Sequence, residues 1–183
     1  MLRRSFLIVL VVAGNSQAAP QIAGPTGLIP EPGPYAVGVR IVQQYDYSRV
    51  LDTPVDAFGK EGNAAPGRPI QTLVWYPAKR AGAAPMQVAD YFEVSLSGVD
   101  FKMSGADTAK QRARWMSSPQ KSLFSAKTLA MRDATPVDGK FPVVIYAPGY
   151  AGVAHENMDL CEYLASHGYV VIASRTLAHV RPR

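Results

Sequence analysis

The sequence predicts an α/β protein whose sheet combines antiparallel opening strands with a parallel strand–helix–strand unit. Residues 35–49 and 68–77 alternate apolar and polar side chains, as strands with one solvated face do. Residues 141–173 contain two continuous apolar runs around a segment of helical period, which is typical of parallel strands joined by a crossover helix. With 183 residues, 48% hydrophobic and 18% charged, the chain has the composition of an ordinary globular domain.

The chain begins with MLRRSFLIVLVVAGNSQAAP, which has the pattern of a secretory signal peptide. Arg3 and Arg4 precede an apolar run, residues 6–13, that is too short to span a bilayer. Ser16 and Ala18 stand at the −3 and −1 positions of a small-residue cleavage site, so we place the cut after Ala18. An uncleaved anchor or a misassigned start codon is the alternative.

Cleavage implies a secreted or periplasmic protein, without a stable membrane anchor because no cysteine stands at the cut to carry a lipid. It removes two arginines and lowers the formal net charge from +5 to +3, which is too small and scattered to indicate a nucleic-acid partner. We divide the chain into a signal peptide (1–18), an extended Pro/Gly-rich leader (19–34), the partial α/β domain (35–177) and an irregular tail (178–183).

The two alternating segments are expected to pair antiparallel. In the first, Val37, Val39 and Ile41 share a face. In the second, the residues that share a face are Ile70, Thr72, Val74 and Tyr76.

Two covering helices are expected between residues 81 and 138. One spans residues 106–116, with Ala109, Ala113 and Met116 on one face. The other begins with Ser118 as N-cap and Pro119 in the first helical position. It continues through Leu123, Phe124, Lys127 and Ala130.

The closing unit is predicted to have strands at residues 143–146 and 169–173, each covered on both faces. The second of them is expected to form the exposed edge of the sheet. Between them, Asn157, Leu160, Cys161 and Leu164 recur at helical spacing, and Gly168 suits the position after the helix. We expect a buried thiol at Cys161; a nucleophile or an intermolecular disulfide is the alternative.

The turn APGYAG, residues 147–152, is the candidate functional loop. Loops at the carboxyl ends of parallel strands are where α/β proteins bind ligands. Pro148, Gly149 and Gly152 allow a sharp turn that presents backbone N–H groups near a helix N-terminus, which suits an oxyanion. The loop has neither a lysine nor a G-x-G-x-x-G pattern, which argues against nucleotide binding. A plain tight connection is the alternative.

The segments FPVVIYAPGYAG and LCEYLASHGYVVIAS resemble the third strand, oxyanion loop, first helix and fourth strand of the α/β-hydrolase fold. PGPYAVGV, YDYSR and RPIQTLVWYP resemble the opening strands of the platelet-activating-factor acetylhydrolase-like branch. Dienelactone-hydrolase-like and cutinase-like polyester hydrolases are similar as well. The resemblance covers most of residues 32–78 and 141–177. It implies an exported serine carboxylic-ester hydrolase that acts on small-molecule, lipid or polyester esters and needs no cofactor.

In that family, the residue after the first glycine of the loop donates its backbone N–H to the oxyanion. By motif this residue is Tyr150, and the resemblance implies that Tyr150 and Ala151 contact the substrate. It assigns Pro148, Gly149 and Gly152 to shaping the loop. The Tyr150 ring is either a wall of the acyl pocket or an aromatic at its rim.

The nucleophile of the family is a serine in a G-x-S-x-G turn, followed along the chain by an acid and a histidine. Ser97, Ser104 and Ser166 lie close to glycines, but none has this pattern. We therefore expect a fragment that carries the oxyanion loop without a catalytic triad and has no ester turnover alone.

The histidines and the acidic residues of the last helix are not expected to replace the triad. We expect His155 to be a solvated residue at the helix start and His167 to lie at the helix C-terminus. His179 lies in the irregular tail, and the spacing of the three indicates no metal site. Asp159 and Glu162 are expected on the solvent side of the helix.

A premature stop or frameshift would explain why the tail departs from the family after Leu177; a short domain is the alternative. Two other functions remain open. One is a non-catalytic exported binding or scaffold protein. The other is half of a two-chain hydrolase whose unknown partner chain carries the serine, the acid and the histidine.

Overall fold

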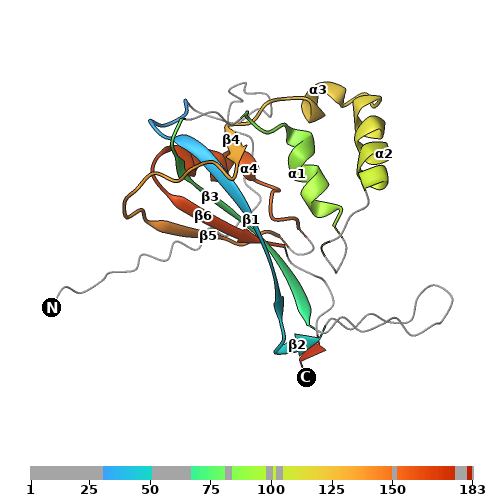
Figure 1. The fold of residues 1–183 in the computed structure, drawn as a ribbon, viewed down its shortest axis with the longest axis horizontal. Coiled ribbons are helices and arrows are strands. Elements are labelled where there is room, and N and C mark those ends of the chain that lie inside the picture. Colours follow the sequence, from blue (N-terminus) through green and yellow to red (C-terminus); the bar gives the residue numbers. More distant parts are fainter. Residues whose placement is uncertain are drawn as a thin grey trace, which may run out of the picture.

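The computed structural model describes residues 31–50, 67–80, 84–97, 101, 105–149, 152–175 and 181–182. Its centre is an open five-stranded sheet with strand order β4-β1-β3-β6-β5 (Figure 1). The strands are β1 (Ala36–Asp46), β3 (Arg68–Ala78), β4 (Ala130–Arg132), β5 (Val143–Tyr146) and β6 (Val170–Ser174). The helices are α1 (Val88–Ser95), α2 (Gly105–Met116), α3 (Lys121–Phe124) and α4 (Met158–Ser166). A small separate pair joins β2 (Arg49–Val50) to β7 (Arg181–Pro182). The predicted α/β class is confirmed.

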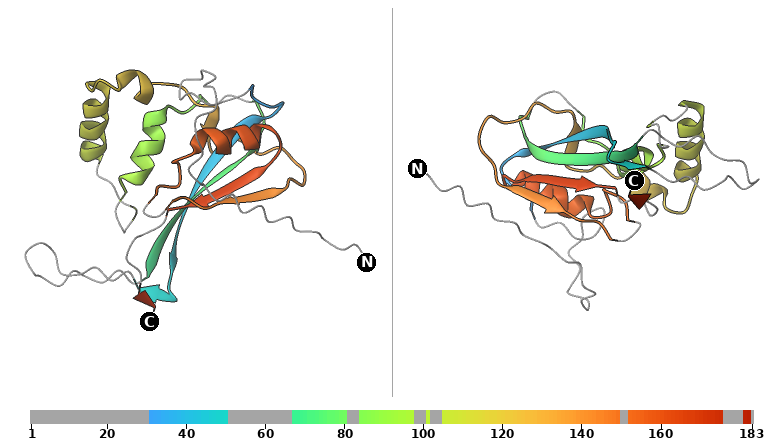
Figure 2. Two further views of the ribbon diagram at one scale, coloured as in Figure 1. Left: turned by 180° about the vertical axis from the view of Figure 1, so that it is seen from behind. Right: turned by 90° about the horizontal axis from the view of Figure 1, so that it is seen from below.

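The main core lies between one face of the sheet and the helices α1 and α4, which Figure 2 shows on the same side of the sheet. The strand residues that fill it include Val37 and Val39 of β1 and Leu73 and Trp75 of β3, all essentially inaccessible to solvent. Within the described part of the chain, no helix is long and apolar enough to cross a bilayer.

The opening strands pair as predicted. β1 and β3 run antiparallel over their full lengths, from Ala36 opposite Ala78 to Asp46 opposite Arg68. Tyr76, on the other face of β3 from Trp75, packs with Ala78 and Met131 in a smaller apolar cluster.

Helix α2 forms where it is predicted, but the predicted face is wrong. Ala109 and Ala113 are exposed. The partly covered side includes Arg112, whose guanidinium contacts Asp90 and Glu93 of α1 at 2.8 and 2.6 Å. Trp115 lies on the same side and packs edge-on against Phe92 of α1, with ring centroids 6.0 Å apart. Helix α2 thus faces α1 with Arg112 and Trp115 rather than with the predicted alanines.

The long helix predicted from Ser118 is wrong. Only a single short helix forms, α3, and Gln120 rather than Ser118 is its N-cap. Ala130 belongs instead to β4, which pairs in parallel with β1 through Val37 opposite Ala130. The free backbone groups along the outer edge of β1 give this segment hydrogen bonds that local sequence does not reveal.

The closing unit is a parallel β5–α4–β6 crossover, as predicted. The predicted edge strand is wrong, however, because β6 also pairs antiparallel with β3 and so lies inside the sheet. The edge is β5, since the crossover returns the chain toward β3. Val143 and Ile145 of β5 are 50% and 66% exposed, so the expected cover on both faces of this strand is also wrong among the described residues.

Helix α4 confirms two predictions and corrects a third. Cys161 is a buried free thiol, and Gly168 has a φ of +91°, the left-handed conformation that ends helices. Of the residues predicted at helical spacing, Cys161 is buried and Leu164 packs against the core, but Leu160 is 43% exposed. The residues of α4 that face the core are Met158, Cys161, Glu162, Ala165 and Ser166.

Candidate functional site

The candidate loop leaves the carboxyl end of β5 and enters α4. Its described part is held by Glu156, whose Oε1 accepts a hydrogen bond of 2.8 Å from the backbone N–H of Gly149. The Tyr146 hydroxyl donates to the same oxygen at 2.9 Å, and Nδ2 of Asn157 donates to that hydroxyl. One carboxylate therefore ties both ends of the loop together.

Gly152 lies too close to the rest of the loop for any side chain. A Cβ at this position would come within 2.3 Å of the Glu156 carboxylate and 2.8 Å of the Gly149 carbonyl oxygen. The backbone N–H of Gly152 donates to that same carbonyl oxygen at 2.8 Å. Gly149 and Gly152 are thus held close together, and the Glu156 carboxylate packs against Gly152.

Tyr150 and Ala151, to which the resemblance assigns substrate contact, lie outside the described residues. Their roles stay predictions. Pro148, immediately before Gly149, is partly buried.

His155 is buried, so the expectation of a solvated histidine is wrong. The residue is only 4% exposed, and its ring packs against those of Phe92 and Tyr91, with centroids 5.0 and 6.1 Å away. Burial, aided by the positive charge of Arg175, lowers the pKa of His155 from 6.5 to about 4. The imidazole is therefore neutral at physiological pH and has both a donor and an acceptor nitrogen.

A pocket of about 830 Å³ opens beside His155, between the loop, α4, α1 and α3. Its apolar lining residues are Val88, Phe92, Leu123, Val153, Met158 and Leu160. Its polar lining comes from the loop and the start of α4, through His155, Glu156, Asn157 and Asp159. Tyr163 completes it.

Glu162 lies in the core, so its predicted place on the solvent side is wrong. It is fully buried, and Oε1 accepts a hydrogen bond of 2.6 Å from the Tyr91 hydroxyl. Oε2 accepts one of 2.7 Å from the backbone N–H of Leu129. Nε1–H of Trp75 donates to the Tyr91 hydroxyl at 2.8 Å. This network joins β3, α1, α4 and the segment before β4.

The pKa of Glu162 is raised from 4.5 to about 7 by burial, against the opposing effect of the Tyr91 and Leu129 hydrogen bonds. Because Glu162 has no exposed surface, it has no contact with a substrate in the pocket. One signal could have revealed it: Glu162 follows Met158 by four positions and Cys161 by one, within the apolar stripe of α4.

Cys161 does not have the properties of a nucleophile. Burial, with the nearby charge of Glu162, raises the pKa of its thiol to about 12, and the side chain has no exposed surface. Within the described ranges no group of three His, Cys, Asp or Glu residues could hold a metal ion.

The far end of α4 has a structural role. The Ser166 hydroxyl donates to the Tyr163 carbonyl oxygen at 2.6 Å and accepts from the backbone N–H of Gly33 at 2.9 Å. His167 caps the helix, as predicted, and is exposed. Neither residue is near the loop, which precedes the first turn of the same helix.

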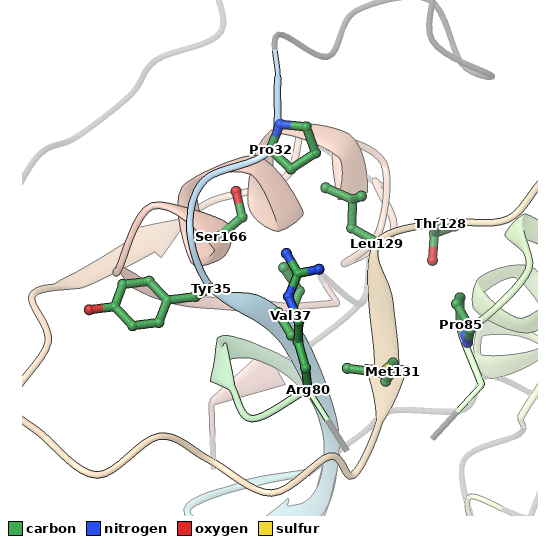
Figure 3. A pocket seen from close by; sticks show the side chains of 10 residues that line it. Pro32, Tyr35, Val37, Arg80, Pro85, Thr128, Leu129, Met131 and Ser166 are labelled. Atoms are coloured by element: carbon green, nitrogen blue, oxygen red, sulfur yellow. The ribbon is translucent and has the colours of Figure 1, made fainter. Parts of the chain in front are cut away.

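A second pocket, of about 460 Å³, lies at this far end (Figure 3). Tyr35, Val37, Leu129 and Met131 provide much of its wall, and Arg80 adds an exposed guanidinium to a mostly apolar lining. Ser166, the last residue of α4, also lines it, so this pocket is separate from the loop.

Comparisons with known proteins find matches among solved structures. No family model matches this chain, and no curated protein matches it. Among solved structures, the chain is similar to a ferulic acid esterase from Streptomyces cinnamoneus, with 23% sequence identity and a TM-score of 0.49. The similarity covers 77% of this chain and 33% of that chain, so this chain spans about a third of the length of the esterase.

Proposed function

We propose that this chain carries the oxyanion loop of an exported carboxylic-ester hydrolase, with the backbone N–H of Tyr150 as the donor. One observation carries the proposal: the N–H of Gly149 binds a carboxylate oxygen of Glu156 at 2.8 Å. One backbone N–H of the loop, that of Gly149, thus already donates to a negatively charged oxygen. Its place, at the carboxyl end of β5 and before α4, is also where α/β proteins bind ligands.

The proposed chemistry follows from the charge that develops during ester hydrolysis. Attack on an ester carbonyl places negative charge on its oxygen, and backbone N–H groups held at the right position stabilise that charge. Losing one such donor costs about 3 kcal/mol of transition-state stabilisation. Glu156 occupies the Gly149 N–H and keeps the turn closed, so the following N–H, that of Tyr150, is assigned to the substrate. Ala151 is assigned to the same contact.

The proposal assigns no turnover to this chain alone. The 183 residues contain no G-x-S-x-G turn, and the only cysteine is a buried thiol with a pKa of about 12. Nucleophile, acid and histidine would have to come from residues outside this sequence. Labelling of a serine in this chain by a fluorophosphonate probe would contradict this part of the proposal.

An NMR titration tests the loop directly. Ethyl butylphosphonate, a monoanion with a tetrahedral centre, resembles the charged intermediate of ester hydrolysis. We expect it to shift the backbone N–H resonances of Tyr150 and Gly152 more than the uncharged diester, diethyl butylphosphonate, does. Glu156→Gln should increase the affinity, because the variant keeps an acceptor oxygen but loses the competing negative charge. Equal responses to the two phosphonates would refute an oxyanion loop.

A non-catalytic binding protein is the second candidate, favoured by a pocket of about 830 Å³ in a sequence without a nucleophile turn. Saturable binding of an acyl ester without turnover would favour this candidate. Co-purification of a chain that carries the missing serine, acid and histidine would instead favour a two-chain hydrolase.

A further inference from the structure

We propose that the pocket beside His155 is a binding site for an uncharged molecule with an aromatic or aliphatic body and one hydrogen-bonding group. Its volume of about 830 Å³ lies in the range of small-molecule sites. The inference goes beyond the proposed function, because such a site needs no nucleophile and would take alcohols or amides as readily as esters.

The first argument is an unused polar group. His155 is 4% exposed and lines the pocket, yet within the described residues no hydrogen bond reaches its ring. Among the described residues, Nε of Arg68 is the fully buried side-chain nitrogen or oxygen without a partner, so the ring nitrogens of His155 keep some accessible surface, where the residue lines the pocket. The His155 ring packs against the rings of Phe92 and Tyr91, which restricts its movement. A hydroxyl or carbonyl group of a ligand would supply the missing partner.

The second argument is the apolar lining. Phe92, Val153 and Met158 border the pocket on its inner side. Leu123 and Leu160 also line it while remaining 36% and 43% exposed. Large apolar side chains at the mouth of a pocket gain free energy when an apolar ligand covers them. The body of the ligand is therefore aromatic or aliphatic.

The third argument concerns charge. Two carboxylates, Glu156 and Asp159, line the pocket, and no lysine or arginine among the described residues does. This arrangement disfavours an anion. Arg175 donates to the Ser95 carbonyl oxygen and is not part of the lining.

Glu156 does not favour a cation, because its carboxylate is already used within the loop. Oε1 of Glu156 accepts hydrogen bonds from the Gly149 N–H and the Tyr146 hydroxyl. The polar group left for a ligand is the neutral imidazole of His155, which both donates and accepts hydrogen bonds.

Three probes of the same shape test the proposal on the full chain at pH 7: 2-naphthylmethanol, 2-naphthoate and 2-naphthylmethylammonium. Calorimetry measures affinity, and NMR follows the ring protons of His155 and His167. We expect the alcohol to bind at least about tenfold more tightly than either ion, which would lose solvation in an apolar pocket. It should shift the His155 ring protons and leave those of His167 unchanged.

Two variants separate the hydrogen bond from packing. His155→Phe keeps a ring between Phe92 and Tyr91 and should weaken alcohol binding roughly tenfold, the value of one hydrogen bond. The matched control, Tyr169→Phe, changes a 37% exposed ring after the other end of α4 that does not line the pocket, and should leave affinity unchanged. If His155→Phe does not fold, Leu160→Ala at the exposed mouth replaces it, with a several-fold loss expected.

Any of three results would overturn the proposal. These are binding of an ion as tightly as the alcohol, unchanged affinity in the folded variants, or alcohol binding without a shift at His155. The phosphonate titration reports on different nuclei, the loop N–H groups, so either proposal can fail while the other stands.

Discussion

The Tyr91 hydroxyl donates a hydrogen bond of 2.6 Å to Oε1 of Glu162, and both side chains are fully buried. The same hydroxyl accepts from Nε1–H of Trp75 at 2.8 Å. Three side chains from α1, α4 and β3 thus satisfy one another where water has no access. Such a network stabilises a core only when every member keeps its partner.

Tyr91→Phe should destabilise the fold by about 1–3 kcal/mol, because it leaves both the Trp75 donor and a Glu162 oxygen without a partner. Chemical denaturation of the variant measures the change in the free energy of unfolding. Tyr47→Phe is the matched control: Tyr47 is 62% exposed, and we expect a change below about 0.5 kcal/mol. Equal effects of the two substitutions would mean that the network adds nothing to stability.

His155 and Glu162 should make stability depend on pH in opposite directions. The pKa of His155 falls from 6.5 to about 4 on folding, so its contribution to stability is present above pH 6.5 and is lost as pH falls through 4. The pKa of Glu162 rises from 4.5 to about 7, so its contribution is present below pH 4.5 and is lost as pH rises through 7. Between pH 4.5 and 6.5 the two effects largely cancel.

Single variants should uncover each effect. His155→Phe removes the histidine titration. The variant should therefore lose less free energy of unfolding than the parent as pH falls from 6.5 to 4. Glu162→Gln removes the glutamate titration. This variant should lose less free energy of unfolding than the parent as pH rises from 4.5 to 7. Each change is expected to reach up to roughly 3 kcal/mol, the equivalent of a pKa difference of about 2.5. Denaturation midpoints across this pH range provide the measurement, and parallel curves for parent and variants would contradict the assignment.

Gly152→Ala should disrupt the candidate loop, because its Cβ would come within 2.8 Å of the backbone carbonyl oxygen of Gly149 and 2.3 Å of the Glu156 carboxylate. We expect a loss of about 1–3 kcal/mol in stability, together with a weaker response of the Tyr150 N–H to the phosphonate. Gly105→Ala at the start of α2 meets nothing within 4 Å and should be neutral or stabilising by up to about 1 kcal/mol. If Gly152→Ala changes stability no more than Gly105→Ala does, the close contacts of Gly152 do not limit the size of the side chain at this position.

Cys161 should resist alkylation while the protein is folded. Its thiol has no exposed surface and a pKa raised to about 12, so the reactive thiolate is scarce at pH 8. Iodoacetamide followed by mass spectrometry should detect modification only after denaturant is added. Rapid labelling of the native chain would contradict this prediction and would support the alternative that Cys161 is a nucleophile.

The local pattern of the sequence predicts much of this fold correctly. Alternation at residues 35–49 and 68–77 predicts the β1–β3 pair. The apolar runs at residues 143–146 and 169–173, on either side of a segment with helical spacing, predict the parallel crossover. Gly168 marks the end of α4 because its left-handed backbone is a local requirement. The position of the candidate loop between β5 and α4 follows from the same patterns.

Contacts between distant segments decide the rest. Ala130 pairs with Val37 because the edge of β1 is available, and Glu162 is buried because Tyr91 and the backbone of Leu129 supply hydrogen bonds from elsewhere in the chain. His155 is buried because α1 places Phe92 over it. Propensity and periodicity act over a few residues and determine the elements themselves. Whether a polar side chain faces water or core depends on which partners the packed chain brings to it, and that is decided only when the segments meet.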